Sequence, residues 1–179
     1  MTLSDPARPA ETSPIARRNL PLLLLKAREA LLTSFRPIIT HFGLTEQQWR
    51  VMRALSEQPE MEPRQICEAI QILSPSLTGV LARMEELGLV ERSRMAADQR
   101  RMHVRLTRRS RDMVARIAPL IEAQYALVEA RLGKPLMADL HCVLDRLLGH
   151  QLESLPTVAL PPVAPPRAAP RRPSGKAAG

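Results

Sequence analysis

Two short stretches of this chain alternate apolar and polar residues, while the other apolar residues recur at helical spacing. The stretches are residues 89–94 and 102–106, and seven mostly polar and basic residues separate them. A period of two is typical of half-buried strands, so the pattern predicts one β-hairpin with a charged tip. Aromatic residues make up only 2% of the chain, which disfavours a sheet core. The sequence therefore predicts a mainly α protein with a single hairpin.

Local start and stop signals predict where the helices begin and end. Thr45 and Gln48 can form a capping box, Thr107 can cap the long helix after the hairpin, and Ser74 before Pro75 can begin another helix with serine as N-cap. Gly88 can end that helix. The predicted helices span about 20–42, 45–59, 63–70, 74–88, 107–132 and 136–152.

The length of 179 residues allows one globular domain with tails. Residues 1–18 have no apolar period and predict a disordered arm, and the Pro/Ala/Arg-rich residues 153–179 predict a disordered tail. The tail is either a solvated appendage or a weak cationic arm that adds sequence-independent affinity for DNA. The folded domain is expected over residues 19–152.

Positive charge is concentrated inside the predicted domain. The chain carries 26 Lys and Arg against 18 Asp and Glu, a net charge of +8, and its pI is about 10.9. Between residues 89 and 116, nine arginines face only Glu91, Asp98 and Asp112. Because guanidinium groups match phosphate geometry and stack on bases, this excess favours a nucleic-acid partner.

Several other classes of protein are disfavoured. No 18-residue apolar run could cross a membrane, and a faint twin-arginine pattern is interrupted by Pro21, so a cytoplasmic location is expected. The sequence pattern contains no Gly-rich phosphate loop, no paired catalytic carboxylates and no nucleophile with its base. No enzyme activity is therefore expected. The histidines lack metal-ligand spacing although His141 adjoins Cys142, which is interpreted as a core residue. We expect no metal and no cofactor.

The two short helices and the basic hairpin together form one composite pattern. A helix with small polar residues at its N-terminus can enter the major groove closely, and its amides and hydroxyls can bind phosphate. Hairpin arginines can enter the narrow, negative minor groove. The pattern predicts a winged helix-turn-helix, with an incidental basic ribbon on a helical protein as the alternative.

The chain resembles the MarR (multiple antibiotic resistance regulator) family over about residues 18–150. The resemblance is carried by LTEQQWRVMRAL, ILSPSLTGVLARMEELGLVER and DQRRMHVRLT. KAREALLTSFRPI before LTEQQWR is similar to the branch that contains repressors of homoprotocatechuate degradation, and nicotinate-pathway regulators are similar too. The resemblance implies a DNA-binding lobe at about 45–106 and dimerisation helices at about 19–43 and 107–152.

A homodimer on a pseudo-palindromic operator in double-stranded DNA follows from this resemblance. The residues support it independently, because the terminal helices are more apolar than one small domain can bury. The function that we expect is a transcriptional repressor of an aromatic-acid catabolic operon, released by a small aromatic carboxylate.

The resemblance also implies which residues contact DNA. On the recognition helix Ser74, Ser76 and Thr78 would contact phosphates and base edges, and Arg83 the backbone or a base. Ser74 is also interpreted as a helix cap, which needs no DNA. Gly79 stands where many members carry a longer polar residue, which leaves direct base readout there open.

On the predicted wing, Asp98 would orient Arg100 for entry into the minor groove, with Arg101 beside it. The alternative for Asp98 is that its side chain closes the turn.

The effector residues are expected at the first helix and just after it. Arg28 falls on an apolar stripe, where its guanidinium needs an anionic partner, either a ligand carboxylate or an intersubunit salt bridge. The resemblance implies that Arg28, His41 and Trp49 hold the carboxylate, hydroxyl and ring of an aromatic acid. Helix capping for His41 and core packing for Trp49 are the alternatives.

Two other modes of regulation stay open. Cys67 precedes the recognition helix, and its oxidation could shift that helix, although the apolar neighbours favour an inert thiol. A DNA-architectural module without an effector is the second alternative, and ligand-induced release from DNA would exclude it.

Overall fold

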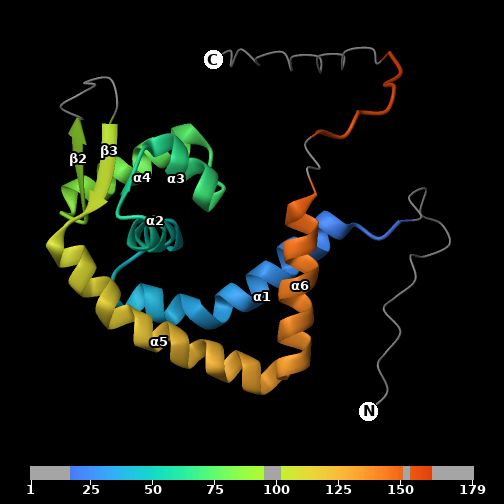
Figure 1. The fold of residues 1–179 in the computed structure, drawn as a ribbon, viewed down its shortest axis with the longest axis horizontal. Coiled ribbons are helices and arrows are strands. Elements are labelled where there is room, and N and C mark those ends of the chain that lie inside the picture. Colours follow the sequence, from blue (N-terminus) through green and yellow to red (C-terminus); the bar gives the residue numbers. More distant parts are fainter. Residues whose placement is uncertain (1–16, 95–101, 151–153, 163–179) are drawn as a thin grey trace, which may run out of the picture. The chain divides into compact units, whose positions relative to one another are not determined.

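The computed structural model describes residues 17–94, 102–150 and 154–162 (Figure 1). The mainly α fold with one hairpin is confirmed. The elements are α1 (Leu20–His41), α2 (Glu46–Glu57), β1 (Glu60–Met61), α3 (Pro63–Ile70), α4 (Ser74–Glu86), β2 (Val90–Arg94), β3 (Met102–Leu106), α5 (Arg108–Leu132) and α6 (Lys134–Gly149). The chain divides into two units, Met1–Lys134 and Pro135–Gly179, and we describe each by itself.

The hairpin predicted from the alternating residues is present, and it belongs to a three-stranded antiparallel sheet of order β1-β3-β2. In the hairpin Val90 pairs with Leu106 and Arg94 with Met102, and at the other edge Met61 pairs with Val104. The sequence analysis missed β1, because a strand of two residues has no periodicity to detect.

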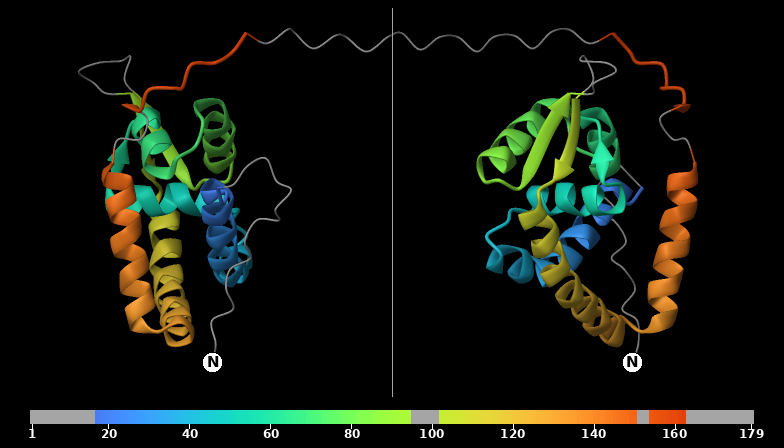
Figure 2. Two further views of the ribbon diagram at one scale, coloured as in Figure 1. Left: turned by 90° about the vertical axis from the view of Figure 1, so that its right-hand side faces the viewer. Right: turned by 60° about the vertical axis from the view of Figure 1, so that its left-hand side comes forward.

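The core of the first unit is built around α2, which packs against α1, α3, α4, α5 and β3. Figure 2 shows α2 crossing beneath the hairpin, with the C-terminal part of α1 and the first turns of α5 on its other side. Its side chains Val51 and Met52 are fully buried. The other core residues come from every helix of this unit and from the sheet, among them Phe35, Ile66, Leu77, Met84, Val104 and Ile117.

Two of the predicted helix caps are confirmed. Thr45 Oγ1 accepts from the Gln48 amide at 3.2 Å while the Gln48 side chain accepts from the Thr45 amide at 2.9 Å, a complete capping box. Thr107 Oγ1 accepts from the Ser110 amide at 3.2 Å and begins α5. Both threonines have extended backbone, which leaves the side-chain oxygen facing the first-turn amides.

The predicted cap at Ser74 is wrong. Leu73 is the N-cap of α4, because its carbonyl already accepts from the Leu77 amide at 3.0 Å. Ser74 is therefore the first helical residue, and its side chain makes no cap hydrogen bond. Gly88 ends the helix as predicted, with φ of +64°, a conformation that other residues adopt only at a cost.

Large apolar side chains remain uncovered on α1 and α6. The N-terminal half of α1 exposes Leu20, Leu23 and Leu25, among others. Within the described residues α6 buries no side chain, so the interpretation of Cys142 as core is wrong and its thiol is exposed. None of the described helices is long and apolar enough to cross a membrane.

Candidate DNA interface and effector pocket

The predicted recognition helix α4 divides into a buried and an exposed face. Leu77, Leu81 and Met84 are buried, as predicted, whereas Leu87 was expected inside and is 36% exposed because it caps the helix. The predicted DNA-contacting residues of this helix all lie on the exposed face, namely Ser74, Ser76, Thr78 and Arg83.

Some polar groups on this face already form hydrogen bonds or ion pairs within the chain. Thr78 Oγ1 donates to the Ser74 carbonyl at 3.1 Å, so the hydroxyl must rotate before it can donate to a phosphate. The Arg83 guanidinium donates to Glu86 at 2.9 Å, and both side chains are almost two-thirds exposed. Because an exposed pair of this kind is weak, a phosphate can replace Glu86 as the partner of Arg83.

The hairpin is tied to α4 and to itself by two ion pairs. Arg92 of β2 pairs with Glu85 of α4, and this hydrogen bond holds the pKa of Glu85 below its ordinary value. Arg105 of β3 pairs with Glu91 of β2 at 2.9 Å. These two arginines are therefore engaged within the fold, whereas Arg94, where β2 ends, is exposed.

The predicted wing residues Asp98, Arg100 and Arg101 lie outside the described residues. Their roles stay predictions. The two strands that would carry them are placed side by side in the expected antiparallel register, so the segment between Arg94 and Met102 connects neighbouring strands.

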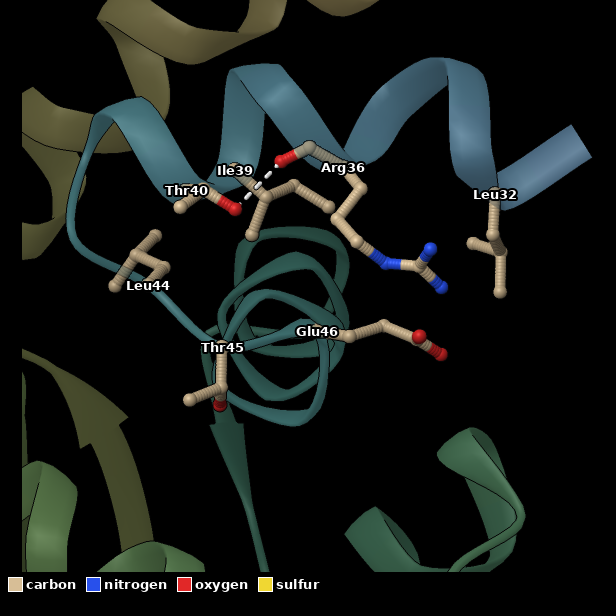
Figure 3. A pocket seen from close by; sticks show the side chains of 7 residues that line it. All are labelled: Leu32, Arg36, Ile39, Thr40, Leu44, Thr45 and Glu46. Carbon is tan, nitrogen blue, oxygen red and sulfur yellow. Dashed lines mark hydrogen bonds between the residues drawn. The ribbon is translucent and has the colours of Figure 1, made fainter. Parts of the chain in front are cut away.

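A pocket of about 280 Å³ lies between the C-terminal half of α1 and the beginning of α2 (Figure 3). Its apolar wall is formed by Leu32, Ile39 and Leu44, and its polar lining is Arg36, Thr40, Thr45 and Glu46. The Arg36 guanidinium and the Glu46 carboxylate reach to the same side of this space (Figure 3). The pocket therefore combines an apolar surface with one cation and one anion.

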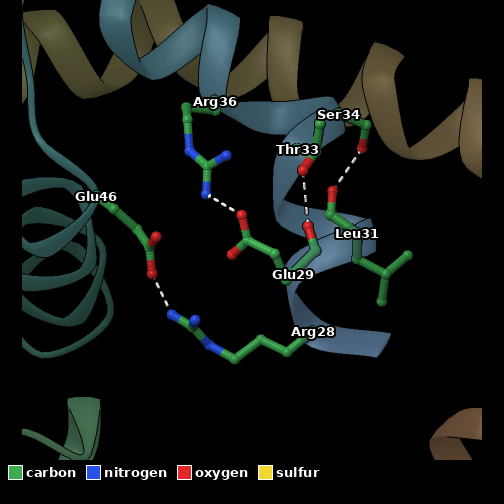
Figure 4. A network of polar contacts seen from close by, with 7 residues as sticks. All are labelled: Arg28, Glu29, Leu31, Thr33, Ser34, Arg36 and Glu46. Carbon is green, nitrogen blue, oxygen red and sulfur yellow. Dashed lines mark hydrogen bonds and ion pairs between the residues drawn. The ribbon is translucent and has the colours of Figure 1, made fainter. Parts of the chain in front are cut away.

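Two ion pairs surround this polar side (Figure 4). Arg28 of α1 pairs with Glu46 of α2, and Arg36 pairs at 2.7 Å with Glu29, about two turns earlier on the same face of α1. The hydrogen bond and the charge of Glu29 raise the pKa of Arg36. Arg28, expected to need a ligand or a second subunit, thus has a carboxylate partner from its own chain.

None of the three predicted effector residues lines this pocket, although Arg28 pairs with Glu46, which does. Trp49 is 9% exposed and belongs to the core, one helical turn after Glu46. His41 is exposed, and its ring meets the Phe42 ring edge-on with centroids 5.3 Å apart. Their roles in binding an effector stay predictions.

A further polar contact joins α2 to α5. Burial disfavours the charged form of Arg53, but the hydrogen bond to Glu57 at 3.3 Å and the nearby Tyr125 side chain outweigh it and raise the pKa of Arg53. The Tyr125 ring lies 4.6 Å from that of Phe35 of α1, measured between centroids. The sequence analysis assigned no role to Arg53, because the tyrosine that meets it is 72 positions away.

Comparison with known proteins identifies the fold's relatives. The model of the MarR family matches residues 42–101. The chain is 40% identical over 130 residues to the homoprotocatechuate degradative operon repressor of Escherichia coli, which covers 73% of this chain and 88% of that protein. The chain belongs to the MarR family.

Two solved structures are also similar to this MarR-family chain. One is the transcriptional regulator PA4135, 43% identical, with a TM-score of 0.71, covering 74% of this chain and 98% of that chain. The other is NadR in complex with 4-hydroxyphenylacetate, 36% identical, with a TM-score of 0.65, covering 75% of this chain and 96% of that chain. The resemblance drawn from the sequence segments is therefore confirmed.

Proposed function

We propose that this MarR-family protein is a transcriptional repressor that binds an operator in double-stranded DNA as a homodimer and is released by a small aromatic acid. The observation that carries the proposal is the exposed small, hydroxyl-bearing face of α4 next to a basic hairpin. The relative that covers most of the chain is named as an operon repressor. The proposal assigns a regulatory rather than a catalytic role, in the cytoplasm where the DNA lies.

The DNA-binding part is tested with a gel-shift titration at fixed salt, on the DNA upstream of the gene itself. Arg100→Ala removes a predicted minor-groove contact and is expected to weaken operator binding by about tenfold or more, with or without effector. Arg146→Ala on α6 is the control, because it removes the same charge outside the predicted DNA contacts. Equal operator affinity for Arg100→Ala and the wild type would exclude the assigned wing contact.

The effector proposal rests on the pocket between α1 and α2. Its volume of about 280 Å³ lies just below the range of about 300–1,000 Å³ that is usual for drug-sized ligands, which suits a single-ring compound. Arg36 can bind a carboxylate and Glu46 can accept from a phenolic hydroxyl, while the leucines and Ile39 contact the ring. NadR, a similar structure, is described with 4-hydroxyphenylacetate.

A ligand in this pocket would change the contacts that hold α1 against α2. Glu46, at the first position of α2, is held by Arg28 of α1, so a ligand that takes up Glu46 or Arg36 changes how these helices are joined. Because α2 packs against α3 and α4, a shift of α2 reaches the recognition helix. A ligand that binds the released state about 100-fold better supplies about 2.7 kcal/mol to that shift.

The chain's only tryptophan provides the readout for this site. Trp49 lies one turn from Glu46, so its fluorescence is expected to change on titration with hydroxylated phenylacetates, benzoates and nicotinates. Arg36→Ala and Arg28→Ala are expected to weaken effector binding by about tenfold or more and to blunt release from the operator. Arg64→Ala, whose side chain is 87% exposed on α3, is the matched control. Unchanged affinity in both Arg36→Ala and Arg28→Ala would overturn the assigned pocket.

A further inference from the structure

The first turns of α5, directly after β3 (Figure 1), place three arginines around one hollow. The hollow measures about 510 Å³ and is lined by Arg108, Arg109, Asp112, Met113 and Arg116. We call it the arginine hollow. Met113 is half-buried and the four charged residues are exposed, so three cations share this space with one carboxylate.

These three arginines lack carboxylate partners, although half of the other arginines in the described residues have one. The described arginines that pair with a carboxylate are Arg28, Arg36, Arg53, Arg64, Arg83, Arg92 and Arg105. Within the described residues no carboxylate lies in ion-pair distance of Arg108, Arg109 or Arg116, although Asp112 is adjacent. Arg109 donates to the Leu87 carbonyl at 3.2 Å, and the Arg116 guanidinium lies 5.4 Å from the Phe42 ring centroid.

The position of Arg108 and Arg109 is electrostatically unfavourable for the helix. They are its first two residues, and the first turn of α5 contains no acidic side chain. The N-terminus is the positive end of the helix dipole, where anions stabilise and cations destabilise. No carboxylate in the described residues offsets this placement, and positions that break such a local rule are expected at functional or strained sites.

We propose that the arginine hollow is a binding site for a phosphate-bearing anion. Guanidinium forks match phosphate oxygens in pairs, and a phosphate group carries up to two charges, which suits three cations better than a single carboxylate does. The phosphate can belong to the backbone of duplex DNA, beyond the α4 and wing contacts, and this possibility rests on the proposed function. It can instead belong to a small phosphorylated molecule, and that possibility does not depend on the proposed function.

The direct test is titration of the full chain with pyrophosphate, measured by isothermal titration calorimetry. Arg108→Gln/Arg109→Gln is expected to weaken pyrophosphate binding at least about tenfold. The control Arg131→Gln/Arg146→Gln removes the same charge from exposed positions of α5 and α6 and is expected to bind as the wild type does. Asp112→Asn removes the one carboxylate and is expected to tighten binding about threefold, which keeps the test decisive if the arginine variant does not fold.

The salt dependence of binding to duplex DNA distinguishes the two sources. If a backbone phosphate occupies the hollow, Arg108→Gln/Arg109→Gln reduces the slope of log affinity against log salt by about 2, and the control variant does not. If the slope is unchanged while pyrophosphate binding is lost, the occupant is a small phosphorylated molecule.

Three results would overturn the proposal. They are equal pyrophosphate binding by the arginine variant and its control, citrate binding as tightly as pyrophosphate, and an absence of pyrophosphate binding together with an unchanged salt slope. The pyrophosphate titration needs no operator, so its outcome stands even if the chain binds no specific DNA sequence.

Discussion

At the scale of single residues, the contact between Glu85 and Arg92 joins the recognition helix to the hairpin. Glu85 is on α4 and Arg92 on β2, so the pair sets how the wing is held against the helix that we propose enters the major groove. The hydrogen bond from Arg92 lowers the pKa of Glu85 from 4.5. A carboxyl group whose pKa is lower in the folded state stabilises the fold only while it is ionised.

We therefore predict a pH-dependent effect of Glu85→Gln. The stabilisation from Glu85 is present above the unfolded pKa of 4.5 and is lost as the pH falls through the lowered folded value. The variant is expected to unfold at lower urea concentration than the wild type near pH 7, and the gap is expected to close toward about pH 2.

The control for this measurement is Glu86→Gln, the neighbouring carboxylate whose partner Arg83 lies on the same exposed helix surface. It is expected to change the urea midpoint little at any pH. A gap between Glu85→Gln and wild type that stays constant across the pH range would contradict the role given to the ion pair.

At the scale of elements, Thr107 joins the start of α5 to the turn between α4 and β2. Its Oγ1 caps the Ser110 amide at 3.2 Å and donates to the Gly88 carbonyl at 2.8 Å. Ser110, fully buried, donates to the Leu89 carbonyl at 2.5 Å. The beginning of α5 is thereby fastened to the end of the recognition helix and the base of the hairpin.

Replacement of this cap is expected to destabilise the fold. Thr107→Ala removes both hydrogen bonds and is expected to cost about 1–2 kcal/mol in the free energy of unfolding, measured by urea denaturation. Thr107→Ser keeps the hydroxyl and is expected to retain most of that stability. If serine and alanine destabilise equally, the methyl group rather than the hydroxyl matters at this position.

The helices and the hairpin were predictable because their signals are local: Thr45, Thr107 and Gly88 act on the residues beside them. The start of α4 was placed one residue late, because whether Leu73 or Ser74 accepts the first helical bond depends on tertiary packing. The effector pocket was only partly predictable. Arg28 was singled out, but it only pairs with a pocket residue, Glu46; Arg36 and Glu46 line the pocket through the approach of α1 to α2, which periodicity does not specify.

At the scale of the whole molecule, the main feature is the apolar surface that a single chain leaves exposed. Leu140 and Leu144 of α6 are each 38% exposed and Val143 is 59% exposed, and several leucines of α1 are similarly open. Neighbouring exposed apolar side chains along one helix mark an interface. The sequence predicted that these helices would need a partner, and which residues meet across it depends on a second chain.

We predict that Leu140→Glu breaks the homodimer, because a carboxylate in an apolar interface has no partner. By light scattering after size exclusion, the variant is expected at the monomer mass of 20.0 kDa and the wild type at twice that mass. Ala138→Glu adds the same charge on the opposite face of α6, since positions 138 and 140 are about 200° apart around a helix, and is expected to remain dimeric. A dimeric Leu140→Glu protein would show that α6 does not form the interface.

The exposed leucines of α1 and α6 also bear on how the amount of protein sets the strength of repression. If two chains must associate to cover these side chains and to bind both halves of an operator, the active species forms by mass action. When most chains are monomeric, halving their concentration lowers the amount of dimer about fourfold. Repression would then respond to gene dosage more steeply than in proportion, so a modest change in expression could switch the target operon.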